Sequence, residues 1–265
     1  MRQYTYGPFQ SRRLNLSLGI DILPKKKCCT YNCVYCEIGP TGPNHLVSPD
    51  FRIKSPPSAN FRKELLDILK YVPHLNSITF GYNGEPTLNE NILDFHNIAH
   101  QVRGELKWTD GKPNLTLFTN SSTLYSEEIR ARVKQFDLVL AKLDCATEED
   151  FQRTNCPHED CTTIEVIINS LIKLKKEMPQ NNKLAIQCLI NRSYREDFLS
   201  NNNSANIESL AHAIKKIKPD LVQIYSIARI PAQYFVFAID EDMKREIVNK
   251  IKEIVNNSLI EVHYY

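Results

Sequence analysis

Residues 29–36 read CTYNCVYC, a run in which Cys29, Cys33 and Cys36 follow the spacing C-x-x-x-C-x-x-C. An apolar stretch that reads as a strand, residues 16–23, precedes the run. Three thiolates this close in sequence can hold one iron–sulfur cube, which ordinarily takes four cysteine ligands. The spacing therefore predicts a cluster with one iron atom left open to bind a small molecule.

Two other interpretations of the three cysteines are open. Structural zinc is almost always four-coordinate and commonly uses two paired half-sites, and no C-x-x-C or H-x-x-x-H pair follows at zinc-finger spacing. Free cysteines also pack as small hydrophobes. Cys28 makes the register ambiguous, but a Cys28–Cys33 pair would leave four intervening residues, so we take Cys29 as the first ligand.

Composition indicates a globular chain. With 265 residues and 42% hydrophobic content, the chain suits one large or two small domains. It has no run of about 18 apolar residues, which a membrane span would need. Its N-terminus, MRQYTYGPFQSRR, has no apolar signal core. Eight cysteines around a ligand motif, without secretory features, favour the reducing cytoplasm and no membrane association.

Positive charge is concentrated near the cysteines. Residues 1–70 carry eleven Lys and Arg against five Asp and Glu, whereas the whole chain has a net charge of only +2. The excess lies mainly at Arg12, Arg13 and residues 25–27, which flank the cysteine motif. Such a rim can attract a phosphate-bearing substrate or nucleic acid. The alternatives are a solvated loop and charges that neutralise a cluster and a cofactor carboxylate.

Strand-like and helix-like segments alternate from residue 16 onward. The predicted strands are 16–23, 77–80, 115–118, 137–143, 184–190 and 221–227, and the predicted helices are 61–71, 89–102, 126–134, 162–176, 207–217 and 241–255. This order implies right-handed crossovers and a parallel sheet. Such a sheet curls into a full or partial barrel whose binding groups lie at the carboxyl ends of the strands. We also expect a short last strand at 260–264 and a flexible insertion at 201–206.

Several polar residues follow predicted strands. Gly84 and Glu85 lie in the turn GYNGEP, where glycine permits close backbone approach and a carboxylate can accept hydrogen bonds from an ammonium group. Lys142 and Asp144 lie two residues apart and so on one side of a strand. Asn120 ends another strand. In a barrel these groups can hold a carboxylate and a ribose, unless the strands end earlier and leave them solvated.

The cysteine run and the GEP turn together resemble the radical S-adenosylmethionine enzymes. Segments between Tyr6 and about Glu241, including SRRLNLSLGIDILPKK and LDCATEEDFQRTNCPH, resemble its wyosine-base-formation-like (Fe-S oxidoreductase) branch. The resemblance implies an α/β fold, a partial (β/α)6 TIM-like barrel over residues 1–240, with the helix and short strand of 241–265 packed on this core.

The resemblance also implies cofactors and their ligands. A [4Fe-4S] cluster on Cys29, Cys33 and Cys36 would bind S-adenosylmethionine and generate a 5'-deoxyadenosyl radical that abstracts hydrogen from a substrate. Gly84 and Glu85 match positions that bind the cofactor's amino group. Tyr35, Asn120, Lys142 and Asp144 are the further candidates for cofactor binding, with Tyr35 expected beside the adenine.

Other features leave the reaction open. Members that modify tRNA bind a second cluster through cysteines ahead of the main motif, and no cysteine precedes Cys28 here. Cys145, Cys156 and Cys161 are therefore candidates for an auxiliary Fe-S cluster or for hydrogen-atom delivery, with plain thiols as the alternative. We expect an external electron donor such as flavodoxin or ferredoxin. The sequence does not identify the substrate, and we expect an RNA nucleoside, a peptide or a small metabolite. The alternative function is a non-catalytic iron–sulfur or zinc-stabilised RNA-binding module.

Overall fold

One curved sheet organises the chain, whose computed structural model describes residues 2–265. Its eight strands lie in the order β1-β2-β3-β4-β5-β6-β8-β10. Their bounds are β1 (Thr5–Ser11), β2 (Asn15–Ile20), β3 (Ser77–Phe80), β4 (Asn114–Thr119), β5 (Leu138–Lys142), β6 (Lys183–Leu189), β8 (Leu221–Tyr225) and β10 (Glu261–Tyr264). Every neighbouring pair from β2 to β10 is parallel, and only β1 is antiparallel to its neighbour.

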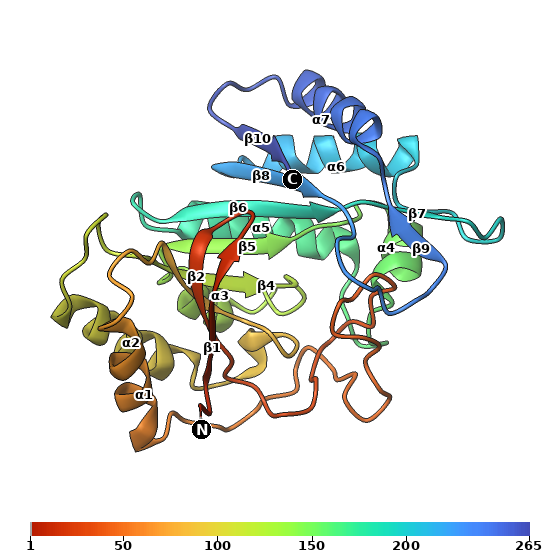
Figure 1. The fold of residues 1–265 in the computed structure, drawn as a ribbon. Helices are drawn as coiled ribbons and strands as arrows, with labels where there is room; N and C mark the ends of the chain where they lie inside the picture. The colour runs from red at the N-terminus through yellow and green to blue at the C-terminus, as the bar shows by residue number, and fades with distance from the viewer. Residues whose placement is uncertain (1) are drawn as a thin grey trace.

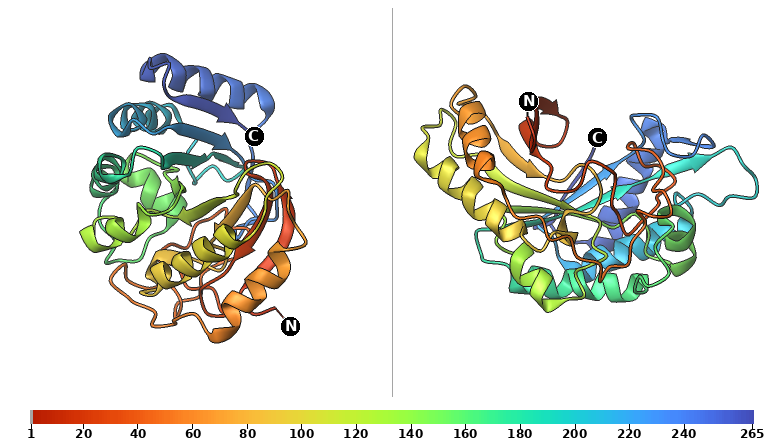
Figure 2. Two further views of the ribbon diagram at one scale, coloured as in Figure 1. Left: turned by 90° about the vertical axis from the view of Figure 1, so that its left-hand side faces the viewer. Right: turned by 90° about the horizontal axis from the view of Figure 1, so that it is seen from below.

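Helices cover the convex side of the sheet (Figures 1 and 2). They are α1 (Ala59–Leu69), α2 (Ile92–Glu105), α3 (Glu127–Val133), α4 (Glu148–Asn155), α5 (Ile164–Glu177), α6 (Ser204–Ile217) and α7 (Glu241–Val255), with one 3-10 turn, η1 (Pro86–Leu88). Side chains cap several of them; Ser126, for example, accepts a hydrogen bond from the Ile129 amide before α3. The result is the α/β partial barrel that the sequence predicts.

The two sides of the sheet differ in chemistry because successive side chains point to opposite faces. Residues that face the helices are apolar and fully buried, as Ile78 and Leu115 are. The residues between them are buried but polar, and they satisfy one another. Ser77 hydrogen-bonds Thr116 at 2.8 Å, and Gln187 donates to Gln223 at 2.7 Å. The concave side of the sheet is thus lined by a buried layer of polar side chains.

Four features depart from the sequence-based expectation. The N-terminal strand β1 and helix α4 were not predicted, and neither was the two-stranded ribbon of β7 (Asn191–Ser193) and β9 (Val236–Ala238). The predicted flexible insertion at 201–206 is wrong, because Asn201 and Asn206 are fully buried. Asn201 donates to the carbonyls of Asp144 and Leu189, at 3.1 and 2.8 Å, and so fixes the end of β5.

The C-terminal segment extends the sheet. β10 runs parallel to β8, and α7 lies between them in sequence, so residues 241–265 complete a further βα unit on the core. Within residues 2–265 we find no helix with the length and apolar character that a membrane crossing requires.

Candidate functional site

The cysteine loop follows β2 and docks on the turn after β3. The amide of Cys28 donates to the carbonyl of Asn83 at 3.0 Å, and the amide of Glu85 donates to the carbonyl of Cys28 at 3.0 Å. Gly84 has φ +133°, and a Cβ there would lie 1.7 Å from the Cys28 carbonyl oxygen. Only glycine fits such an approach. The GEP turn and the cysteine loop therefore form one unit at the carboxyl ends of β2 and β3.

A second set of contacts seats the middle of the loop. The amide of Val34 donates to the carbonyl of Thr154 at 3.0 Å, and the amide of Asn32 donates to the carbonyl of Asn155 at 3.1 Å. Both acceptors belong to the end of α4. Val34 and Tyr35 also belong to a small apolar cluster with Tyr225, at the end of β8. The loop is thereby fixed against the carboxyl ends of strands on both sides of the barrel.

Each of the three candidate ligand sulfurs accepts a hydrogen bond from a side-chain nitrogen. Asn120 Nδ2 lies 3.5 Å from Cys29 Sγ, Asn155 Nδ2 lies 3.5 Å from Cys33 Sγ, and Lys27 Nζ lies 3.2 Å from Cys36 Sγ. These donors come from the end of β4, the end of α4 and the loop itself. A neutral thiol is a weak acceptor, whereas hydrogen bonds to thiolate sulfur are a feature of iron–sulfur sites. The donor set therefore fits thiolates that bind a cluster.

Among residues 2–265, no three Cys, His, Asp or Glu side chains surround a point that one ion could fill. Burial, and next the neighbouring Cys36, raise the pKa of Cys33 to about 12, and burial likewise raises the pKa of Cys29. Binding of a cluster must therefore displace thiol protons. Cys28 is 6% exposed, and its backbone docks the loop on the GEP turn. This structural role of Cys28 agrees with the choice of Cys29 as the first ligand.

Glu85 is completely buried, and both of its carboxylate oxygens are engaged. Oε1 accepts from Thr119 Oγ1 at 2.9 Å and from the Thr87 amide at 3.1 Å, while Oε2 accepts from the Asn120 amide at 2.5 Å. Burial raises the pKa of this carboxyl group. Glu85 thus connects the GEP turn to the end of β4 and places Asn120 beside Cys29. Contact between Glu85 and a cofactor amino group stays a prediction.

Asp144 is the centre of a buried polar network. Its carboxylate accepts from Asn155 Nδ2 at 3.0 Å, from the Leu189 amide at 2.7 Å and from the Tyr35 hydroxyl. Lys142 Nζ lies 3.1 Å from the same carboxylate. The network joins the end of β5 to the cysteine loop and to α4. Asp144 therefore positions the loop, and its expected contact with a ribose stays a prediction.

Lys142 extends from this network toward the end of β8. Its ammonium group donates to the Tyr225 hydroxyl at 2.6 Å and lies 4.9 Å from the centre of the Tyr35 ring. Burial lowers the pKa of Lys142, but Asp144 and Tyr225 outweigh burial and raise it, so the side chain is cationic. Lys142 is accordingly a fixed positive charge beside the cysteine loop.

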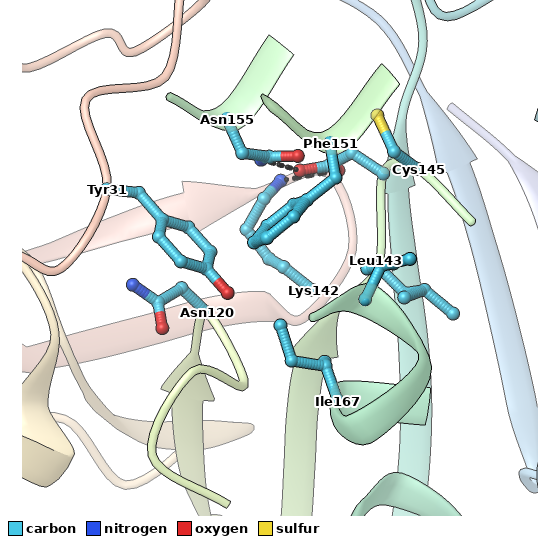
Figure 3. Close-up of a pocket in the computed structure, with 10 residues that line it drawn as sticks. Tyr31, Asn120, Lys142, Leu143, Cys145, Phe151, Asn155 and Ile167 are labelled. Atoms are coloured by element: carbon cyan, nitrogen blue, oxygen red, sulfur yellow. Dashed lines mark hydrogen bonds and ion pairs between the residues drawn. The ribbon is translucent and has the colours of Figure 1, made fainter. Parts of the chain in front are cut away.

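A small cavity lies under the network. It has a volume of about 10 Å³ and is lined by residues that include Tyr31, Asn120 and Lys142. Figure 3 shows Tyr31 and Asn120 on one side and Lys142 and Asn155 farther across. The Tyr31 hydroxyl, which is buried, has no hydrogen-bond partner within the part of the chain that the structure describes. The space suits one water molecule.

None of the three remaining candidate cysteines accepts a hydrogen bond from Asn120, Asn155 or Lys27 within the described residues. Cys145 is fully buried in the main core. Cys156 follows α4 with φ 42° and donates its thiol to the Arg153 carbonyl at 3.3 Å. Cys161 donates to the Thr30 carbonyl at 3.6 Å, and burial raises its pKa to about 12. These contacts are those of packed thiols, and the auxiliary-cluster and hydrogen-atom roles stay predictions.

Sequence reasoning missed Asn155 and Lys27 as members of the site. Asn155 is the last residue of α4. A capping pattern in the sequence could have revealed this helix, because Thr147 accepts a hydrogen bond from the Asp150 amide and Glu148 and Glu149 lie in the first turn. In the sequence, Lys27 is one of three consecutive lysines, and nothing local distinguishes it from the other two. Its contact with Cys36 depends on the path of the loop, which no local pattern reports.

Comparison with known proteins places the fold. No protein-family model matches the chain. Native anSMEcpe with bound AdoMet superposes with a TM-score of 0.60 at 15% identity, covering 92% of this chain and 63% of that one. Streptococcus suis SuiB bound to S-adenosylmethionine gives 0.57 at 13% identity, and this chain spans half of it. TYW1 with a lysine-pyruvate adduct gives 0.54 at 14% identity, covering 89% and 73%.

Sequence relatives give the family. A protein of Brachyspira hyodysenteriae named GTPase Obg is 28% identical over 246 residues, but this chain spans only 32% of its length. A UPF0026 protein of Methanocaldococcus jannaschii is 28% identical over 258 residues, covering 95% of this chain and 70% of that one. A UPF0026 protein of Synechocystis sp. is 30% identical over 219 residues, covering 83% and 73%. The chain belongs to the UPF0026 protein family and has the fold of the radical S-adenosylmethionine enzymes.

Proposed function

We propose that this protein is a radical S-adenosylmethionine enzyme. The observation that carries the proposal is the hydrogen-bonded set of sulfurs on Cys29, Cys33 and Cys36, fixed at the carboxyl ends of parallel strands. The three thiolates would hold a [4Fe-4S] cluster that has one iron without a protein ligand. When bound, the cluster and S-adenosylmethionine together supply a 5'-deoxyadenosyl radical, which removes a hydrogen atom from the substrate.

The protein's own residues would hold and orient these groups. Gly84 lets the GEP turn pack on the cysteine loop, and Glu85 fixes Asn120 beside Cys29. Lys142 supplies a cation that would attract the carboxylate of the cofactor, because its charge is fixed beside the loop. Tyr35 presents an aromatic ring next to that cation, where a planar adenine would pack.

The substrate would bind over the polar concave side of the barrel. Thr79 and Gln223 make the lining of that side polar, although both are buried, and a small-molecule site needs only a few placed polar groups. Lys25 and Lys26 are exposed beside the loop, but the chain beyond residue 70 has more acidic than basic side chains. RNA binding would need a broad basic surface. We therefore place a peptide or small metabolite ahead of an RNA nucleoside, with an external reductant as partner.

Anaerobic reconstitution tests this function. Iron and sulfide, added to the purified protein, should give about four of each per chain, as one cube requires. Addition of S-adenosylmethionine to the reduced protein should change its electron paramagnetic resonance spectrum, because the cofactor would bind the open iron. Uptake of zinc alone would support the non-catalytic module instead. An electron paramagnetic resonance spectrum that does not change when S-adenosylmethionine is added would support it as well. Binding of tRNA at low salt, lost as salt rises, would favour the RNA nucleoside.

A further inference from the structure

Lys27 differs from the two lysines that precede it. Lys25 and Lys26 are exposed to solvent, whereas Lys27 is half-buried. Its ammonium group lies 3.2 Å from Cys36 Sγ and donates to the Gly39 carbonyl at 2.7 Å. The basic run, which the sequence presents as one patch, therefore divides into two solvated charges and one charge directed at a candidate ligand.

The backbone holds Lys27 in this position from both sides. Next to it, Cys28 is paired with the GEP turn through hydrogen bonds with Asn83 and Glu85. At the other end of the contact, the Gly39 amide donates to the Cys36 carbonyl at 3.1 Å. Lys27 thus spans the loop between two fixed points, and its side chain is ordered by two acceptors at once.

The charge on Lys27 is not neutralised by a carboxylate. None of the ion pairs within residues 2–265 involves Lys27; the nearby Glu37 pairs with Arg229 at 3.1 Å. The donors to Cys29 and Cys33 are neutral amides of Asn120 and Asn155, and each amide also has other partners. Of the three side chains that donate to a candidate ligand sulfur in the part of the chain described, Lys27 alone is cationic.

We propose that Lys27 is a positioning residue for Cys36 that makes the cluster easier to reduce. The inference rests on the proposed function, because it requires the cluster on the three cysteines. A cube with three thiolate ligands is anionic, and one-electron reduction adds a further negative charge without making or breaking a bond. A cation and an N–H donor at 3.2 Å stabilise the reduced form more than the oxidised form, because the attraction grows with the negative charge.

The test is a redox titration of the reconstituted protein with dithionite as the electron source, followed by electron paramagnetic resonance without added cofactor. We expect Lys27→Met to lower the ratio of reduced to oxidised cluster about tenfold at the wild-type midpoint, which equals about 59 mV for a one-electron couple. Lys27→Arg, which keeps charge and donors, should restore most of the ratio. Lys26→Met is the matched control, because it removes the same charge one residue away and should leave the midpoint in place.

The outcomes separate this inference from the proposed function. A wild-type protein that forms no cube overturns both. A cube in wild type whose midpoint is the same in Lys27→Met, or moves equally in Lys26→Met, overturns the role of Lys27 alone. If Lys27→Met folds, by circular dichroism, but takes up no iron while Lys27→Arg and Lys26→Met do, the positioning role is supported.

Discussion

Gly84 and Cys28 lie so close that their backbones form an isolated parallel bridge between the turn after β3 and the loop after β2. A Cβ on Gly84 would fall 1.7 Å from the Cys28 carbonyl oxygen, closer than any side-chain atom can lie to a backbone. This contact sets the position of the loop that carries the three candidate ligands. It also explains why the GEP turn and the cysteine motif, far apart in sequence, act as one structural unit.

The first prediction concerns this contact. Gly84→Ala should lower the free energy of unfolding by about 2–4 kcal/mol, because it adds a steric clash to a backbone conformation that alanine rarely adopts. Urea unfolding measures the loss, and iron uptake on reconstitution should fall with it. Gly42→Ala is the control, since a Cβ on Gly42 meets nothing within 4 Å. Equal effects of the two substitutions would contradict the account of the loop.

The second prediction concerns the ligand set. Cys29→Ala, Cys33→Ala and Cys36→Ala should each lose the cube, because three protein ligands leave none to spare. Iron and sulfide analysis after anaerobic reconstitution reports the loss. Cys28→Ala should retain the cube, since Cys28 docks the loop through its backbone. Cluster iron that persists when all three ligands are alanine would show an auxiliary cluster. Loss of the cube in Cys28→Ala would mean that Cys28, and not Cys29, is the first ligand.

The third prediction concerns the buried ion pair. Asp144→Asn should destabilise the protein by about 3 kcal/mol, because it leaves the partly buried ammonium of Lys142 without its counter-charge. The double variant with Lys142→Met should recover part of this loss in denaturant unfolding. Asp197→Asn, which breaks an exposed pair with Arg195, should change the stability far less, because solvent screens that pair. If Asp144→Asn costs no more than this control, the network does not hold the loop.

The fourth prediction concerns pH. Burial raises the pKa of Asp21, which follows β2, to about 6 in the folded protein. The stabilising contribution of its protonated form is therefore complete below the unfolded pKa, and it is lost as the pH rises through about 6. Asp21→Asn keeps an oxygen for the Leu23 amide, which lies 3.1 Å from Asp21 Oδ1, and cannot ionise.

The variant should therefore be more stable than the wild type at pH 7.5 by about 1–2 kcal/mol, after allowance for the partial exposure of the carboxyl group. At pH 4 the two proteins should agree. Guanidinium unfolding at both pH values gives the comparison, with the exposed Asp67→Asn as the control. A difference that is the same at the two pH values would mean that ionisation of Asp21 is not its cause.

Much of the fold follows from local patterns. The strands β2 to β6 and β8, and the helices other than α4, repeat apolar residues at the period of their element, and capping residues such as Ser126 mark where helices begin. β1 escaped prediction because it is a half-exposed antiparallel edge that contains Gly7 and Pro8, residues that local rules exclude from strands.

The parts that could not be predicted depend on contacts between distant segments. Asn201 and Asn206 read as a solvated loop because asparagine favours turns, yet both are buried where backbone groups at the end of β5 need partners. The pairing of Lys27 with Cys36 has the same origin. Strand-end positions such as Asn120 and Asp144 could be selected from sequence, but the partners that occupy their polar atoms could not.

Cleavage of S-adenosylmethionine tests the central claim most directly. Protein reconstituted without oxygen and reduced with dithionite should form 5'-deoxyadenosine and methionine in equal amounts, measured by liquid chromatography with mass spectrometry. Cys33→Ala, handled identically, should form neither product above the level of dithionite alone. A wild-type protein that carries a complete [4Fe-4S] cluster and forms no 5'-deoxyadenosine, or a Cys33→Ala variant that forms as much as the wild type, would contradict the account.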